Sequence, residues 1–302
     1  MLQTNAARTD TMTPPMTNVE ASAAAVVARL DETHTAEVLG FLAERALHTV
    51  YMMGLIRDNG IVSPLNRGTF YGCRDAAGAL EGVALIGHAT VVETRTDRAL
   101  EAFAALAQQN SSAHLIVGEQ DKIEQFWHHY SEGGQTPRLV CRELLFELSW
   151  PVAVAESVEG LRLATLADLD LILPVHAQMA FDESGVNPLE ADPEGFRRRC
   201  ARRIELGRVW VMVEDGTLIF KADVVSETPE AVYIEGVYVS PQARGRGYGT
   251  RCLSQLALTM LTHSRTLVLV SNEANQAAAR FYRRVGFKLR GFYDTVFLQR
   301  TH

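Results

Sequence analysis

The sequence has few cysteines and no pattern among them. The four, at positions 73, 141, 200 and 252, are far apart and form no C-x-x-C pair. This spacing argues against both a zinc site and a disulfide framework. We therefore expect no metal ion, and the reduced, buried thiols of a cytoplasmic protein.

Long apolar runs and an excess of positive charge are also missing. No stretch of about 18 apolar residues is present, so no membrane-spanning helix is expected. The apolar stretch 21–30 lacks the basic residues that precede a secretory signal. The net charge of −7 gives no sign of nucleic-acid binding. The local run Arg197–Arg203 is interpreted as a solvated helix face paired with Glu194 and Glu205, with contact to a phosphate or an acidic partner as the alternative.

The length of 302 residues suggests two domains or one large one. Residues 1–20 are polar and contain two adjacent prolines, which predicts a disordered tail. A predicted strand over 142–148 ends just before Ser149-Trp150-Pro151, and a polar stretch follows. We expect a first domain over 21–150 and a second over 151–302.

Specific chemistry is indicated first by residues 237–249, which read V-Y-V-S-P-Q-A-R-G-R-G-Y-G. An alternating strand pattern stops at Pro241, an Arg/Gly-rich turn follows, and a helical pattern begins at Tyr248. The glycines of the turn allow a sharp bend without obstructing Cβ atoms. The N–H groups at the helix start, with Arg244 and Arg246 beside them, favour a bound pyrophosphate. No Gly-Lys pair of a Walker loop is present.

A second pattern follows at residues 275–287, N-Q-A-A-A-R-F-Y-R-R-V-G-F. It comes directly after the short apolar run Thr266–Ser271, which has the size of a buried strand. Apolar residues recur at helical spacing, and Gly286 is a plausible stop. The segment predicts a helix packed beside a buried strand.

Together these two segments resemble the motifs of the GCN5-related N-acetyltransferase (GNAT) family, over about residues 160–300. Arg244, Gly247 and Gly249 fall on the family's R/Q-x-x-G-x-G/A pattern, and residues 275–287 match its second motif without a gap. The resemblance implies an α/β fold with a mixed sheet, in which two splayed strands hold the pantetheine arm of acetyl-CoA. The residues that it assigns to acetyl-CoA binding are Val237, Tyr238, Val239, Arg244, Gly245, Arg246, Gly247, Tyr248, Gly249, Asn275, Phe281 and Tyr282.

The element order βααβββαβαββ of the second half fits this fold, with predicted helices over 166–180, 194–206, 249–263 and 274–285. The first half follows a similar order, from a long helical pattern over 34–57 to a helix over 123–130. In place of the glycine loop it has V-V-E-T-R-T-D-R at 91–98, with no glycine. We interpret the chain as a tandem protein whose N-terminal half is a degenerate acetyltransferase-like domain. The alternative is an unrelated α/β domain.

Candidate catalytic residues follow from what acetyl transfer requires, which is removal of a proton from the amine and return of one to the thiolate. Glu235, on the predicted central strand, is the candidate base, with a cross-strand salt bridge as the alternative. Tyr282 occupies the position where relatives place a hydroxyl near the thioester sulfur, with plain packing as the alternative. Asn275 binds pantetheine or caps its helix.

The acceptor is expected at the segment between the first two helices of the second half, residues 181–188. Asp182 and Glu183 could hold a cationic amine there, although an ordinary acidic loop fits the pattern as well. His176 is interpreted as a helix-face histidine.

The function implied is transfer of an acetyl group from acetyl-CoA, as co-substrate, to a primary amine by direct attack in a ternary complex. A protein lysine and a small-molecule amine both remain open. So does transfer of another acyl group, and so does a regulatory protein that senses acyl-CoA without turnover. The expected partners are acetyl-CoA and the amine, with no nucleic acid and no membrane, and the sequence leaves the oligomeric state open.

Overall fold

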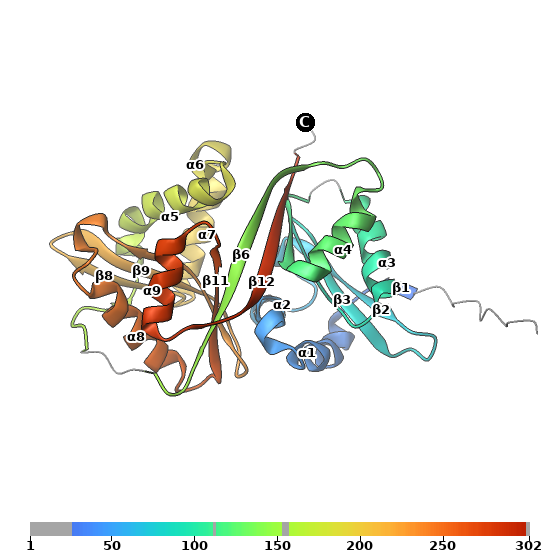
Figure 1. Ribbon diagram of the computed structural model, residues 1–302, viewed down its shortest axis with the longest axis horizontal. Helices are drawn as coiled ribbons and strands as arrows, with labels where there is room; N and C mark the ends of the chain where they lie inside the picture. The colour runs from blue at the N-terminus through green and yellow to red at the C-terminus, as the bar shows by residue number, and fades with distance from the viewer. Residues whose placement is uncertain (1–25, 111–112, 153–156, 300–302) are drawn as a thin grey trace, which may run out of the picture.

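A single twelve-stranded sheet runs through the whole molecule in the computed structural model (Figure 1). The structure describes residues 26–110, 113–152 and 157–299. The tail predicted for residues 1–20 lies outside these ranges.

The N-terminal half supplies six strands and four helices of the described residues. They are β1 (Val26–Arg29), α1 (Thr35–Ala43), α2 (Ala46–Asn59), β2 (Gly68–Arg74), β3 (Leu80–Gly87), β4 (Ala89–Thr94), α3 (Asp97–Gln108), β5 (Leu115–Glu119), α4 (Gln120–Ser131) and β6 (Pro137–Ser149). The helical pattern expected over 34–57 is therefore two helices. The chain turns at Arg45, whose side chain binds Glu93 and Glu119.

The C-terminal half has a similar order of elements. They are β7 (Arg162–Leu163), α5 (Leu169–Ser184), α6 (Pro188–Ala191), α7 (Pro193–Glu205), β8 (Val209–Glu214), β9 (Thr217–Glu227), β10 (Val232–Val239), α8 (Tyr248–Met260), β11 (Thr266–Asn272), α9 (Gln276–Val285) and β12 (Lys288–Leu298). Two closing strands were expected after α9, but this half has one, β12.

The final strands of the two halves are exchanged. The strand order is β1-β2-β3-β4-β5-β12-β6-β11-β10-β9-β8-β7, which reads alike from both edges. β6, from the first half, pairs through residues 143–149 with β11, and β12, from the second, pairs with β5. β6 and β12 also pair with each other at the centre of the sheet (Figure 1). Each half thus gives its own final strand to the other half and receives that half's final strand in return.

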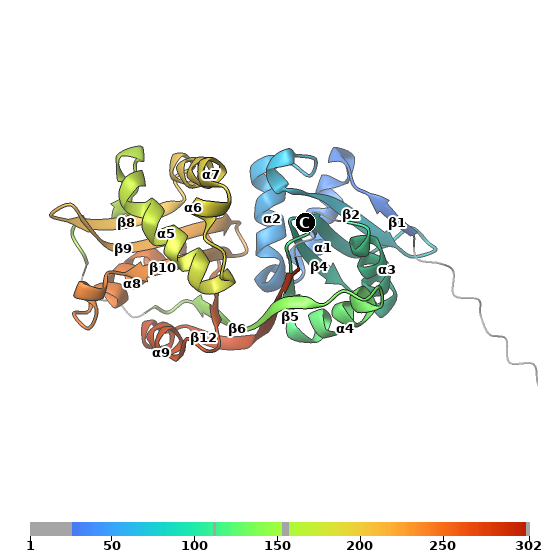
Figure 2. The same cartoon turned by 90° about the horizontal axis from the view of Figure 1, so that it is seen from above.

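Helices cover both faces of this sheet, and the two faces carry different clusters of buried side chains. On one face α3 and α4 pack over the first half and α8 and α9 over the second. On the other, α1 and α2 cover the first half and α5 and α7 the second. Figure 2 shows α4 and α9 on one side of the sheet and α2 and α7 on the other.

Helix α2 joins the halves, because it also packs on the central strands. Val50 of α2 forms one buried cluster with Leu145 of β6 and Val268 of β11. Farther along α2, a Cβ on Gly54 would lie 2.3 Å from Ser226 Oγ of β9. Only a glycine allows so close an approach of a helix to a strand from the other half.

Candidate functional site

The strand β10 leaves its neighbour β11 after only two pairs. Val232 pairs with Leu267 and Tyr233 with Val268, and beyond them β10 pairs with β9 alone. The edge of β10 that faces β11 is therefore open from Ile234 onward. Backbone groups on such an edge can bind an extended ligand.

A bulge in β10 lies just beyond this divergence. The pairing with β9 shifts between Glu235 and Tyr238, and Gly236 has a φ of +59°. Lys221 Nζ donates a hydrogen bond of 3.2 Å to the carbonyl oxygen of Gly236. A Cβ at Gly236 would lie 2.7 Å from that nitrogen, so the bulge requires glycine.

The loop from β10 to α8 has the predicted glycine turn. Gly245 and Gly247 have φ values of +75° and +82°. Gly247 is the N-cap of α8 and no side chain caps the helix there, so its first N–H groups remain available to an anion. A Cβ at Gly249 would lie 2.9 Å from the Val239 side chain, so this third glycine lets α8 pack closely against β10.

Arginines surround this helix start. The guanidinium groups of Arg246 and Arg251 lie 5.3 and 5.1 Å from the centre of the Tyr248 ring. Arg244 donates to the carbonyl oxygen of Val239. The positive charge predicted for the loop is thus held beside the N-terminus of α8.

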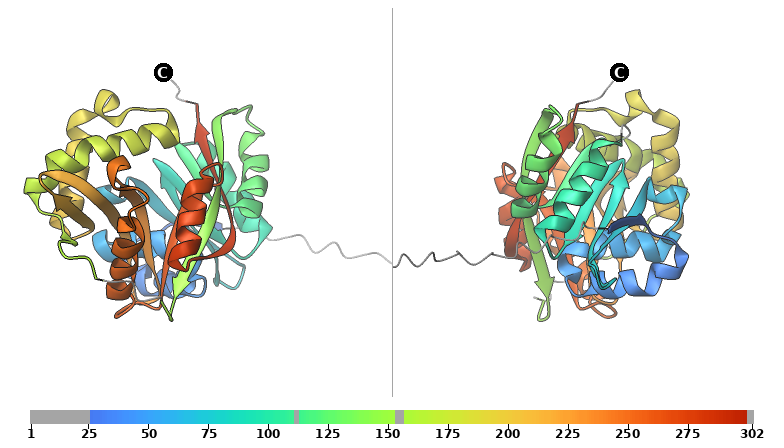
Figure 3. Two further views of the ribbon diagram at one scale, coloured as in Figure 1. Left: turned by 60° about the vertical axis from the view of Figure 1, so that its left-hand side comes forward. Right: turned by 90° about the vertical axis from the view of Figure 1, so that its right-hand side faces the viewer.

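Helix α9 lies against β6 (Figure 3) and carries the second motif. Asn275 Oδ1 accepts from the N–H of Ala278, so the side chain caps α9. Tyr282 is 8% exposed, and its ring packs against Phe146 of the exchanged strand. Phe281 packs partly buried beside it. Burial raises the pKa of Tyr282 above the usual value of a phenol, so the side chain keeps its proton and can act as a proton donor but not as a base.

The equivalent region of the N-terminal half has a different construction. Only Arg95 and Thr96 connect β4 to α3, and Thr96 Oγ1 accepts from the N–H of Ala99, which caps the helix. The strands β4 and β5 correspond to β10 and β11. In β4 the buried Glu93 binds Arg45 and Lys122. Paired cationic and carboxylate side chains thus occupy the end of β4, which corresponds to the open end of β10.

Glu235 and Glu183 interact electrostatically on the face covered by α2, α5 and α7. Glu183 lies near the end of α5, which continues to Ser184 where a loop was expected. Water reaches its side chain, yet the surrounding protein and the Glu235 carboxylate raise its pKa to about 7. Asp182, also exposed, accepts a hydrogen bond from Gln178 within α5. Glu235 and Tyr282 belong to opposite faces of the sheet, beside the diverging strands.

Sequence reasoning missed Glu143 of β6. Its side chain is 6% exposed, and Thr295 of β12 donates to its Oε2 at 2.8 Å. Burial, with added repulsion from Glu183 and Glu235, raises its pKa to about 7. The available signal was a pair of glutamates, Glu143 and Glu147, in an otherwise largely apolar strand. It pointed to this site only once the strand exchange was known.

A buried ion cluster supports β10 from the β9 side and was also missed. Asp223 Oδ2 lies 2.8 Å from Lys221 Nζ and 3.0 Å from Arg203 Nη1. Burial opposes the charge of Asp223, but these cations hold its pKa below the usual range. His176 lies 4.0 Å away, and burial lowers its pKa to about 4, with Lys221 adding to the shift. Its imidazole is neutral, and it packs against Phe196.

The arginines of α7 are largely paired, though with other partners than Glu194 and Glu205. Arg197 binds Asp170 and Arg199 binds Asp192. Arg202 donates to Asn59 of the first half. This run therefore stabilises the fold and the contact between the halves.

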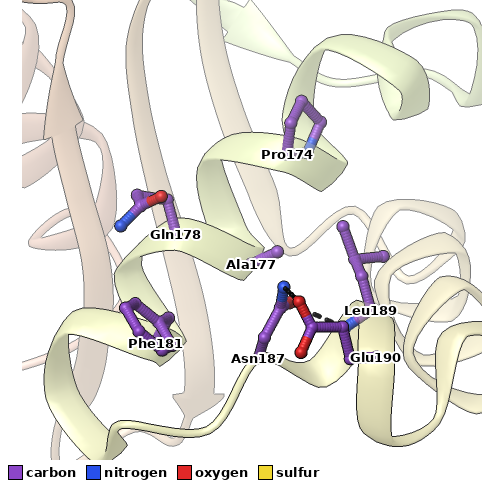
Figure 4. A pocket seen from close by; sticks show the side chains of 7 residues that line it. All are labelled: Pro174, Ala177, Gln178, Phe181, Asn187, Leu189 and Glu190. Atoms are coloured by element: carbon purple, nitrogen blue, oxygen red, sulfur yellow. Dashed lines mark hydrogen bonds between the residues drawn. The ribbon is translucent and has the colours of Figure 1, made fainter.

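A pocket of about 270 Å³ lies between α5 and α6 (Figure 4). It is lined by Pro174, Ala177, Gln178, Phe181, Asn187, Leu189 and Glu190. At 100° per residue, Glu183 projects from the opposite side of α5. The pocket is thus a separate place from the one that Glu183 faces.

Within the described ranges, no three His, Cys, Asp or Glu side chains gather in a way that could hold a metal ion. In the same part of the chain, every helix is too short or too polar to cross a membrane.

Comparison with known proteins places this site within a family domain. Residues 205–289 match the model of the acetyltransferase (GNAT) domain. The match spans α8, β11 and α9 and includes both motifs. No curated protein sequence matches the chain.

Solved structures with low sequence identity share the fold of the entire chain. A Drosophila protein matches with a TM-score of 0.68 and 14% identity, over 92% of this chain and 100% of its own. A GNAT acetyltransferase from Colwellia psychrerythraea matches with a TM-score of 0.56 and 12% identity, over 91% of this chain and 100% of its own. A tandem GNAT protein from the clavulanic acid biosynthesis pathway matches with a TM-score of 0.57 and 12% identity, over 92% of this chain and 100% of its own. The tandem arrangement predicted from the sequence is confirmed.

Proposed function

We propose that this chain, which carries an acetyltransferase domain of the GNAT family within a tandem arrangement of two such folds, transfers an acetyl group from acetyl-CoA to a primary amine. The observation that carries the proposal is the departure of β10 from β11 directly beside the uncapped glycine start of α8. An extended thioester arm and a pyrophosphate need these two features in this order.

The residues fit acetyl-CoA as follows. The N–H groups of residues 245–249 and the side chains of Arg244 and Arg246 would hold the pyrophosphate. The open edge of β10 at Val237, Tyr238 and Val239 would bind the pantetheine. The same site would be shaped by Tyr248, Gly249, Asn275 and Phe281. Gly249 would act through close packing, and Asn275 through its amide nitrogen, which the helix cap does not use.

Acetyl-CoA supplies the activated acyl group, and the protein's own residues supply binding and proton transfer. Glu235 would accept the proton of the attacking amine, directly or through water. Tyr282 would donate its proton to the departing sulfur. Glu183 and Asp182, at the end of α5, would hold the amine on the Glu235 side of the sheet. Both reactants would be bound together, so that proximity provides much of the rate.

The experiment that tests this proposal is a calorimetric titration with acetyl-CoA, followed by a screen of primary amines for release of free thiol. Binding together with thiol release that depends on an amine is expected. Binding without turnover of any amine would instead favour an acyl-CoA-sensing protein. Absence of binding would contradict the proposed site itself.

A further inference from the structure

The bulge of β10 resets which side chains of this strand face which layer of helices. Before the bulge, Ile234 belongs to the buried cluster under α8 and α9. A regular strand would place residues 236 and 238 on the same face as Ile234, since side chains alternate. Instead Val237 and Val239 pack against that cluster, and Tyr238 packs against the cluster under α5 and α7. The one extra residue, Gly236, thus shifts the outer part of β10 by one position.

This shift is what allows α8 to lie against β10. A Cβ at Gly249 of α8 would already lie 2.9 Å from the Val239 side chain. The contact therefore has room for a valine, but not for the larger Tyr238 that a regular strand would place on this face. The bulge is thus a condition for the glycine start of α8 to lie beside the open edge of β10.

Lys221 of β9 holds the bulge through its carbonyl oxygen. The side chain of Lys221 is fully buried, and its Nζ donates to the carbonyl oxygen of Gly236 at 3.2 Å. The same nitrogen lies 2.8 Å from Asp223 Oδ2. In the pairing of β9 with β10, Asp223 stands opposite Glu235 and Lys221 opposite Tyr238. Two side chains on one face of β9 thus flank the bulge from both ends.

Neutralising Asp223 does not by itself explain a second cation in this place. Arg203 Nη1 lies 3.0 Å from Asp223 Oδ2 and already balances its charge. Burying an ammonium group is costly, and an apolar side chain could pack here at lower cost. What Lys221 adds is a charged donor at the carbonyl of the bulge, and charged donors make the stronger hydrogen bonds.

The first half has neither the bulge nor the lysine. There β4 pairs with β3 in unbroken register to its last residue. Val83 of β3 stands opposite Glu93 and so corresponds to Asp223, and Glu81, two residues before Val83, corresponds to Lys221. The lysine and the bulge therefore occur together, in the half with the open strand edge, and both are absent from the half in which this place is closed.

From this arrangement we infer that Lys221 is a positioning residue, which holds the bulge of β10 and thereby sets the open edge at residues 237–239 for the acyl arm of acetyl-CoA. It takes no part in binding the pyrophosphate, which the glycine loop holds. The inference rests on the proposed function for the identity of the bound arm. It goes further in assigning the arrangement of that part of the site to a buried side chain of the neighbouring strand.

Lys221→Met tests this inference on the full chain, because methionine has a similar length but no donor, and Asp223 keeps Arg203. Calorimetric binding is measured for acetyl-CoA and for 3′-phosphoadenosine 5′-diphosphate, the part of it that carries the phosphates without the acyl arm. We expect acetyl-CoA to bind about tenfold more weakly and the fragment to bind as in the wild type. A general loss of structure would instead weaken both. The control is Lys122→Met, which leaves Glu93 bound to Arg45 in the first half and should change neither affinity.

Hydrogen exchange of the protein without ligand gives a second readout that does not depend on acetyl-CoA. In Lys221→Met the amides of residues 236–240 should exchange faster than in the wild type, because the bulge has lost its donor. The amides of residues 232–234, before the bulge, should keep their wild-type rates. Lys122→Met should change neither segment.

Gly236→Ala is the second variant if Lys221→Met does not fold. The new Cβ would lie 2.7 Å from Lys221 Nζ, so it displaces the ammonium group and keeps its charge. It should weaken acetyl-CoA binding and leave binding of the fragment unchanged. Gly216→Ala is its control, since Gly216 in the β8–β9 turn has a φ of +74° and open space around it.

Wild-type affinity for acetyl-CoA in a folded Lys221→Met protein would overturn the inference, as would an equal loss of affinity for both ligands. Unchanged exchange of residues 236–240 would do the same, whether or not acetyl-CoA binds. A wild-type protein that binds neither ligand, with the difference in exchange intact, would contradict only the proposed function.

Discussion

Glu93 of β4 and Glu235 of β10 occupy equivalent positions in the two halves. Each stands two residues beyond the last pair that its strand makes with the following parallel strand, Val91 with Val117 in one half and Tyr233 with Val268 in the other. Glu93 is buried and bound by two cations, whereas Glu235 is exposed. One position thus has opposite environments, closed in the first half and open in the second.

This difference predicts one acetyl-CoA site per chain. In the first half Thr96 caps α3 and the connection from β4 has only two residues, so the N–H groups needed for a pyrophosphate are partly occupied. Calorimetric titration should give a stoichiometry of one. A stoichiometry of two would mean that the first half binds acetyl-CoA despite its capped helix.

Gly247→Glu should abolish detectable acetyl-CoA binding. A carboxylate at the N-cap of α8 would place negative charge where the pyrophosphate is expected, and the φ of +82° there disfavours any side chain. The matched control is Gly78→Glu, since Gly78 has a φ of +88° and open space around it in the β2–β3 turn. Unchanged affinity in a folded Gly247→Glu protein would remove the loop from the binding site.

Tyr282→Phe should lower kcat by about tenfold or more while changing the Kd for acetyl-CoA much less. The ring contacts with Phe146 and Phe287 are kept in this variant, and only the proton donor is lost. Tyr130→Phe is the control, because Tyr130 is a buried tyrosine of α4, the corresponding helix of the first half. Equal kcat values for the two variants would assign Tyr282 to packing.

Glu143→Gln should stabilise the protein above neutral pH. The pKa of Glu143 rises from the usual 4.5 to about 7 on folding, so between these values the folded chain holds a proton that the unfolded chain has lost. Its contribution to the free energy of unfolding therefore falls as pH rises through this window, by about 3 kcal/mol in all. A glutamine at position 143 does not ionise, so the variant loses no stability in this pH range.

Thermal unfolding at pH 5 and pH 8 measures this effect. The melting temperature of Glu143→Gln should exceed that of the wild type at pH 8, and the difference should shrink at pH 5. Glu205→Gln, at an exposed position, should show no such dependence on pH. A difference independent of pH would show that Glu143 is not protonated on folding.

Local patterns in the sequence were sufficient for much of the fold and for the cofactor side of the site. The glycine turn before Tyr248 and a helix over 274–285 follow from short-range rules on glycine, capping and helical spacing. The structure has the turn, and it has the helix at Gln276–Val285. The helical pattern over 34–57 hid a break at Arg45 because that break depends on Glu93 and Glu119, distant in sequence. The two motifs also identified the GNAT domain, because their residues lie close together along the chain.

The surroundings of the residues proposed to bind the acceptor amine could not be predicted from such local patterns in the sequence. The charges of Glu183 and Glu235 act on Glu143 only because β6 pairs with β11 of the other half. Arg138 of the same strand binds the carbonyl oxygen of Ser184 at the end of α5. Strand exchange depends on which long-range pairing buries most apolar surface, and both strands have the same alternating pattern whichever half they join. The sequence by itself thus determined the elements and the glycine loop, whereas the tertiary structure decided which half completes the site.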